Sequence, residues 1–178
     1  MYMDLSESQV FNTLRRTWPV FDDFKSFNQL LCEGWVNNAF FNKNIPYIWR
    51  SNKRISEERF WNVFAKVFSS IDEPDGFILF HEKHAGWRKK RGRRIRNGVS
   101  LHRLLDVPIF VRGFAFYSRR QWQYGEMNDN YNLLLAHSRS FISFTHEGEF
   151  LCFSTDKSKL MEIARSFHSF HLACEFGF

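Results

Sequence analysis

The first third of the chain carries apolar residues at helical spacing. Ser6 opens a capping-box pattern, and the apolar positions after it recur every three or four residues until Pro19, which cannot continue a helix. A second amphipathic stripe covers residues 24–35. Residues 37–52 are rich in Asn and include Pro46, so we expect an irregular connection there.

The clearest helical pattern follows Ser56, the expected N-cap. Glu57 and Glu58 occupy the first turn, where negative charge complements the helix dipole. Five apolar residues then line one face of this helix: Phe60, Val63, Phe64, Val67 and Phe68. A turn cluster over residues 69–76 ends it.

Beyond residue 76 the pattern changes to that of strands. The apolar run 77–80 predicts a buried strand, and 107–117 predicts a central strand because it is apolar on both faces. Residues 140–145 and 149–154 predict a hairpin about a turn at Glu147-Gly148.

The remaining elements are less regular in pattern. Ser100 is expected to cap a short helix through Leu105, and residues 131–137 fit a helix or a strand equally well. Thr155 or Asp156 is the expected cap of a final helix. The predicted fold is therefore α+β: N-terminal helices, then a mostly antiparallel sheet with a C-terminal helix packed on it.

A length of 178 residues fits a single domain over 1–178. Within it we distinguish a helical N-terminal part, 1–70, from a sheet-containing part, 77–178. Aromatic residues make up 19% of the chain, including 22 Phe, and most of them must lie in the core.

Charge changes this picture at one place, the loop expected over residues 86–98. Seven of the nine residues 88–96 are Arg or Lys, whereas the whole chain has a formal charge of only +6. We call residues 88–96 the basic stretch. Gly86, Gly92 and Gly98 bracket and divide it, which favours a loop over a continuous recognition helix. The expected contact residues here are Trp87, Arg88, Lys89, Lys90, Arg91, Arg93, Arg94 and Arg96.

Two weaker groups of basic and aromatic residues accompany the basic stretch. The second group comprises Arg112, Arg119, Arg120, Trp122 and Tyr124. The third group comprises Tyr47, Trp49, Arg50, Lys53 and Arg54. Interleaved cations and aromatic rings are typical of surfaces that bind single strands or splayed bases.

The seven cations of the basic stretch repel one another unless a polyanion neutralises them. Nucleic acid is the commonest polyanion. We expect a non-enzymatic accessory or regulatory protein that binds the nucleic-acid backbone, DNA or RNA, with weak sequence preference. The alternative is an interaction module or inhibitor whose basic loop docks on an acidic protein.

A second alternative is a nuclease that uses His81, Glu82, His84 and His102, whose imidazoles could act as general acid and base beside bound phosphate. The spacing of these residues matches no standard set of metal ligands, and no phosphate-binding or catalytic motif occurs. We expect no catalytic residues, no metal and no cofactor.

Three cysteines lie far apart, and the first residues lack the pattern of a signal peptide, so we expect a cytoplasmic protein. In a eukaryotic cell the basic stretch would also suit a nuclear import signal. No run of 18 apolar residues occurs, so we expect no membrane partner.

Overall fold

The computed structural model describes residues 2–32, 36–51, 57–69, 73–74, 76–82, 98–102, 130–144, 149–168 and 175–177. Within these residues the strands form one eight-stranded sheet in the order β1-β4-β3-β5-β6-β7-β2-β8, and every pairing between them is antiparallel. The strands are β1 (Tyr2–Leu5), β2 (Tyr47–Ser51), β3 (Phe77–Glu82), β4 (Gly98–Leu101), β5 (Asn130–Leu135), β6 (Ser140–Phe144), β7 (Glu149–Ser154) and β8 (Glu175–Gly177).

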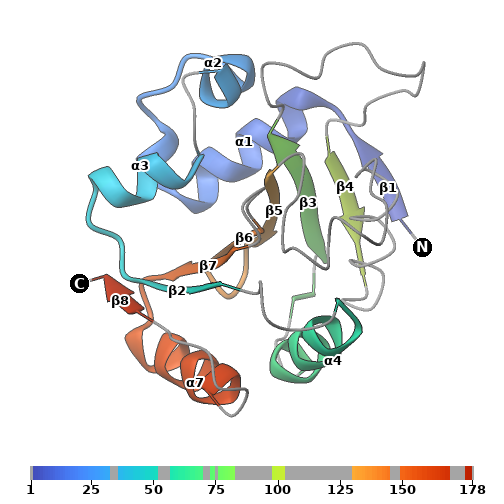
Figure 1. Ribbon diagram of the computed structural model, residues 1–178. Helices are drawn as coiled ribbons and strands as arrows, with labels where there is room; N and C mark the ends of the chain where they lie inside the picture. The colour runs from blue at the N-terminus through green and yellow to red at the C-terminus, as the bar shows by residue number, and fades with distance from the viewer. Residues whose placement is uncertain are drawn as a thin grey trace.

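Helices cover both faces of the sheet (Figure 1). The described helices are α1 (Glu7–Thr17), the 3-10 helix η1 (Pro19–Phe21), α2 (Phe27–Cys32), α3 (Val36–Asn42), α4 (Glu57–Phe68) and α7 (Lys157–His168). Helices α1, α2 and α3 lie on one side of the sheet, and α4 and α7 lie on the other. The α+β prediction is confirmed, and the sheet is more fully covered than the pattern indicated.

Alternation along the central strands supplies both faces with apolar side chains. On β3, Phe77 and Leu79 belong to the core under α4 and α7, whereas Phe80 belongs to the core under α1 to α3. Leu133 and Leu134 divide in the same way on β5. A strand that is apolar on both faces is therefore the mark of a sheet buried between two helical layers.

The core under α1 to α3 is built around Phe40, which is fully buried. Its ring stacks on Phe153 of β7 with centroids 4.5 Å apart and lies 4.8 Å from the ring of Phe141 of β6. The rings of Trp18 and Phe21 meet it edge-on at 5.0 and 5.2 Å. Helix α3 is thus joined to the sheet and to the end of α1 through one side chain.

The opposite core lies between the sheet and the pair α4 and α7, which pack against each other. Rings of Trp61 and Phe64 on α4 lie 5.2 and 5.6 Å from that of Phe144 on β6. Helix α7 contacts β7 and β2. The prediction that the C-terminal helix packs on the sheet is confirmed.

The predicted start and end of the first helix are confirmed. The backbone N–H of Ser6 donates to Gln9 Oε1 at 2.8 Å, and the backbone N–H of Gln9 donates to Ser6 Oγ at 3.3 Å, which completes the capping box. Helix α1 ends at Thr17, and Pro19 begins the short helix η1.

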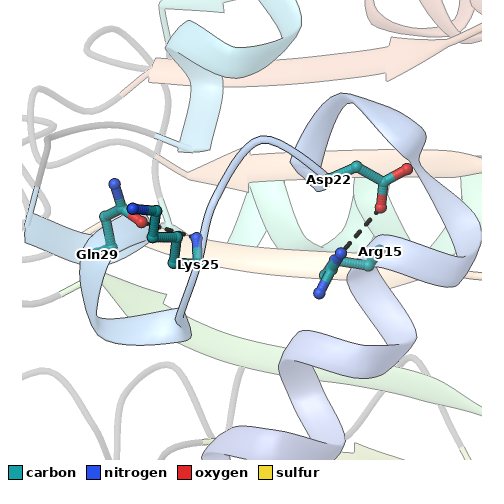
Figure 2. Close-up of polar contacts among 4 residues, drawn as sticks. All are labelled: Arg15, Asp22, Lys25 and Gln29. Carbon is teal, nitrogen blue, oxygen red and sulfur yellow. Dashed lines mark hydrogen bonds and ion pairs between the residues drawn. The ribbon is translucent and has the colours of Figure 1, made fainter.

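Polar contacts shape the chain between α1 and α2 (Figure 2). Arg15 Nε lies 3.3 Å from Asp22 Oδ1, and the backbone N–H of Lys25 donates to Gln29 Oε1 at 2.7 Å. The backbone N–H of Gln29 donates in turn to Ser26 Oγ. Ser26 thereby caps α2, which begins at Phe27, later than the stripe over 24–35 indicated.

Two sequence-based expectations are wrong. Residues 37–52 are not irregular, because they contain most of α3 and the whole of β2. Ser100 begins no helix, since it lies within β4, paired to β1 and β3. Strands β2 and β4 are short, and they are strands because they pair with neighbouring strands in the sheet.

Other expectations are confirmed or lie beyond the described residues. The strands at 140–144 and 149–154 pair as the hairpin prediction required, the ambiguous stretch is strand β5, and Asp156 Oδ1 caps α7 by accepting the backbone N–H of Lys159. The strand predicted over 107–117, the Ser56 cap and the Glu147-Gly148 turn lie outside the described residues.

The N-terminal 70 residues share the sheet with the rest of the chain. Strand β1 pairs with β4, and β2 lies between β7 and β8. The distinction between a helical part, 1–70, and a sheet part, 77–178, stays a prediction.

Candidate nucleic-acid interface

The predicted contact residues all lie outside the described residues. They are Trp87, Arg88, Lys89, Lys90, Arg91, Arg93, Arg94 and Arg96 of the basic stretch, together with Arg112, Arg119, Arg120 and Trp122. The structure does describe the strand ends from which the chain enters and leaves these stretches. The positions of these strand ends in the sheet follow from the strand register.

The basic stretch belongs to the connection between two neighbouring strands. Strand β3 ends at Glu82 and β4 begins at Gly98, and the two pair antiparallel with Phe80 opposite Gly98. Residues 83–97 consequently leave and re-enter the sheet at the same end. At that end Gly98 also pairs with Leu5 of β1, directly before the start of α1.

The second basic and aromatic group precedes a strand that begins at the same place. Asn130, the first residue of β5, pairs with Glu82, the last residue of β3. The described strand ends next to the two stretches, Asn130 and Glu82, are therefore neighbours in the sheet. Three adjacent strands, β4, β3 and β5, carry the ends of both stretches.

The third group lies elsewhere. Strand β2, which contains Tyr47, Trp49 and Arg50, is separated from β5 by β6 and β7. In Figure 1 it lies crosswise to β3 and β4, as expected when each step between strands adds a twist of about 20–25°. The described residues of this group thus lie three strands away from β5, and Lys53 and Arg54 lie outside the described residues.

Two aromatic rings of the third group belong to the core. Tyr47 lies with its ring centroid 5.0 Å from that of Phe41 and 5.6 Å from that of Phe153, and Trp49 is partly buried against the same cluster. These contacts explain both rings, which are only partly buried, as packing on β2.

The described residues carry no excess of positive charge. They include one more acidic than basic side chain, although the whole chain has a formal charge of +6. Two ion pairs among them, Arg15 with Asp22 at 3.3 Å and Lys43 with Asp23 at 3.5 Å, are largely exposed, and such pairs contribute about 0–1 kcal/mol each. The cations that make the chain basic are thus carried by the connections between these elements.

The histidines proposed for a nuclease do not all lie together. His81 pairs with Tyr131 near the Glu82 end of β3, whereas His102 follows Leu101, which pairs with Phe77 at the other end. Four residues of strand separate these positions, or about 14 Å. The register thus separates the backbone positions of His81 and His102, His84 lies outside the described residues, and the nuclease alternative stays a prediction.

Other chemistry-bearing groups in the described part are few. A search of the described residues finds no group of three His, Cys, Asp or Glu side chains placed to hold a metal ion. Cys152 is fully buried on β7, and this burial raises the pKa of its thiol to about 12. The thiol is therefore protonated and a poor nucleophile at neutral pH.

One buried carboxylate was not singled out by any sequence pattern. Glu73 is 9% exposed, and its Oε2 and Oε1 accept the backbone N–H groups of His137 and Ser138 at 2.9 and 2.8 Å. It fixes the turn between β5 and β6 from a segment that follows α4. Its role is structural, because the turn lies at the end of the sheet opposite Glu82 and Asn130.

A small polar cluster lies under α3 at the centre of the sheet. Asn37 Nδ2 donates to Ser143 Oγ at 3.2 Å, and Ser143 pairs across the strands with Asn132. Both side-chain polar atoms of Asn132 are buried, and neither has a hydrogen-bond partner among the described residues. The cluster orients α3 on β6 at some cost in desolvation.

Comparison with known proteins adds no relative. No protein-family model, no curated protein and no solved structure matches the chain. In the described residues, no helix is both long enough and apolar enough to cross a membrane.

Proposed function

We propose that the protein binds nucleic acid through the basic stretch, contacting the phosphate backbone without catalysing a reaction on it. The observation that carries the proposal is the separation of charge. The sheet and its two helical layers are close to neutral, whereas residues 88–96 alone hold seven cations.

The density of these cations favours a polyanion over an ordinary protein partner. Duplex DNA carries one charge per about 1.7 Å of its axis, so a short length of it can neutralise all seven cations. Five of the seven are Arg, which can form two parallel hydrogen bonds to one phosphate where Lys cannot. An acidic protein surface seldom offers charge at such spacing.

The position of the basic stretch in the chain also supports binding. Register brings both ends of residues 83–97 to one end of the sheet, beside the start of β5. Backbone contacts from a cationic connection position a protein on nucleic acid but carry little sequence information.

The test is a titration of duplex and single-stranded oligonucleotides of several sequences at a series of salt concentrations. If all seven cations reach duplex phosphates, a plot of log K against log[salt] should have a slope of about −6. Similar affinity across sequences is expected.

A triple variant, Arg91→Gln/Arg93→Gln/Arg94→Gln, should make that slope shallower by about 3. The matched control, Arg16→Gln/Lys66→Gln/Arg165→Gln, removes three exposed cations from α1, α4 and α7 and should leave the slope unchanged. Absence of binding to every oligonucleotide at low salt would overturn the proposal. In that case capture of an acidic protein by the basic stretch would support the alternative of an interaction module.

A further inference from the structure

We propose that the polar cluster under α3 binds one internal water molecule, held by Asn132 of β5, Ser143 of β6 and Asn37 of α3. The inference is independent of nucleic-acid binding. It rests on three side chains that meet at the centre of the sheet and on the hydrogen-bonding groups that they leave unmatched.

Strand alternation brings the side chains to one face of the sheet. Asn132 lies two residues before Leu134, which belongs to the core under α1 to α3, so Asn132 faces the same helices. Ser143 lies on that face for the same reason, two residues after Phe141. Asn132 and Ser143 are direct cross-strand partners, whose Cβ atoms lie about 4.5–5.5 Å apart. Asn37 on α3 reaches the same point, because its Nδ2 donates to Ser143 Oγ at 3.2 Å.

The cluster is shut off from solvent. Asn132 and Ser143 are fully buried, and Asn37 is 5% exposed. Among the described residues, Asn132 Nδ2, Asn132 Oδ1 and Asn37 Oδ1 have no hydrogen-bond partner. A buried amide without a partner destabilises the folded state, so a ligand that bonds to these atoms would stabilise it.

Water matches the hydrogen-bonding groups of the cluster. The two amide oxygens only accept hydrogen bonds, whereas the hydroxyl of Ser143 can donate one while it accepts the bond from Asn37. One water molecule can donate to Asn132 Oδ1 and Asn37 Oδ1 and accept from Ser143 Oγ, which gives the roughly three bonds typical of a buried water. It thereby satisfies two of the three unmatched atoms.

The surroundings favour a ligand as small as water. Across the strands, Phe80 of β3 lies opposite Asn132 and Leu151 of β7 lies opposite Ser143, and both side chains are buried. The ring centroid of Phe27 on α2 lies 5.7 Å from that of Phe80. A metal ion is disfavoured, because none of the three polar side chains is charged and a buried ion needs a compensating charge.

A crystal structure of the full chain, at a resolution that orders internal water, tests the site directly. We expect one isolated peak of density within about 3.2 Å of Asn37 Oδ1 and of an amide atom of Asn132. A direct hydrogen bond between the two amides, a cluster without density between them, or density larger than one water would overturn the proposal.

Magnetic relaxation dispersion of water oxygen counts long-lived internal waters in solution. Asn132→Leu keeps a side chain branched at the γ position but removes both polar atoms, so it should lower that count by one. Ser140→Ala is the matched control and should leave the count unchanged. Ser140 is also fully buried on β6, but it pairs with Leu135 on the face that belongs to α4 and α7. An unchanged count in Asn132→Leu, or the same loss in the control, would contradict the proposal.

A urea titration with a single cooperative transition shows that each variant is folded. If Asn132→Leu does not fold, Ser143→Ala takes its place, because it removes only a hydroxyl and with it one hydrogen bond of the water. Ser143→Ala should reduce the amplitude of the dispersion, whereas Ser140→Ala should not. Equal amplitudes in the two serine variants would count against the site.

Discussion

Glu73 is the residue on which the turn between β5 and β6 depends. Two backbone N–H groups at consecutive positions, those of His137 and Ser138, point at the two oxygens of one buried carboxylate. Hydrogen bonds to a charged acceptor contribute about 1.5–3 kcal/mol each, and more is lost when a buried donor is left unpaired. In the same turn Arg139 has a φ of 48°, in the left-handed region, which makes an external clamp more important.

The substitution Glu73→Gln should lower the free energy of unfolding by about 2 kcal/mol. The amide N–H₂ of Gln would face one of the two backbone N–H donors, which would lose its acceptor. Urea denaturation measures this as a lower midpoint with an unchanged slope. Glu162→Gln, an exposed position on α7, is the matched control and should change the midpoint little. An unchanged midpoint for Glu73→Gln would show that the clamp does not stabilise the turn.

At the scale of elements, α3 links the N-terminal helices to the sheet. It has only seven residues, too short to be stable alone, and its stability comes from packing through Val36, Ala39 and Phe40. Because the ring of Phe40 stacks on Phe153 of β7, removing the Phe40 side chain should destabilise the sheet as well as helix α3.

Replacing Phe40→Ala should cost about 3–5 kcal/mol, the loss expected for a fully buried aromatic side chain. Hydrogen exchange should accelerate in β6 and β7 as well as in α1 and α3, with a single cooperative unfolding transition. Phe41→Ala is a comparison on the same helix, and its effect should be smaller because Phe41 is 36% exposed. Faster exchange confined to the helices would indicate that residues 1–70 unfold as a separate unit.

At the scale of the whole molecule, a near-neutral layered body is joined to strongly cationic connections. Most of the described side chains of both cores come from helices and strands on which the basic stretch does not lie. The repulsion among the seven cations therefore opposes folding, and salt should relieve it.

Arg91→Gln/Arg93→Gln/Arg94→Gln should accordingly melt at the same temperature as the unaltered protein or higher, with a weaker dependence on salt. Thermal melts at low and high ionic strength measure both quantities. A lower melting temperature at low salt would mean that these side chains pair with acidic groups of the protein. The loss of nucleic-acid binding in this variant would then have a second explanation.

Local patterns were sufficient for elements whose residues carry the signal themselves. The capping box at Ser6, the apolar face of α4 and the hairpin strands of β6 and β7 each follow from spacing within about a dozen residues. The charge of the basic stretch is likewise a property of the sequence alone. The fold class could be predicted from these features because the spacing of apolar residues within each element indicates a helix or a strand.

The missed elements depend on partners far away in the chain. Strand β1 is four residues long and is held by β4, about 95 residues later, and β2 is held by β7 and β8. No local period marks such short strands, because their backbone hydrogen bonds and burial come only from assembly of the sheet.

The candidate interface divides in the same way. Composition and charge along the chain determined that one stretch concentrates seven cations and that two other groups combine cations with aromatic rings. Only the tertiary structure placed the strand ends next to these groups: Asn130 pairs with Glu82, whereas Ser51 lies at the same end of the sheet but three strands away from Asn130. Distance between stretches is set by strand order, which depends on long-range pairing and not on any local pattern.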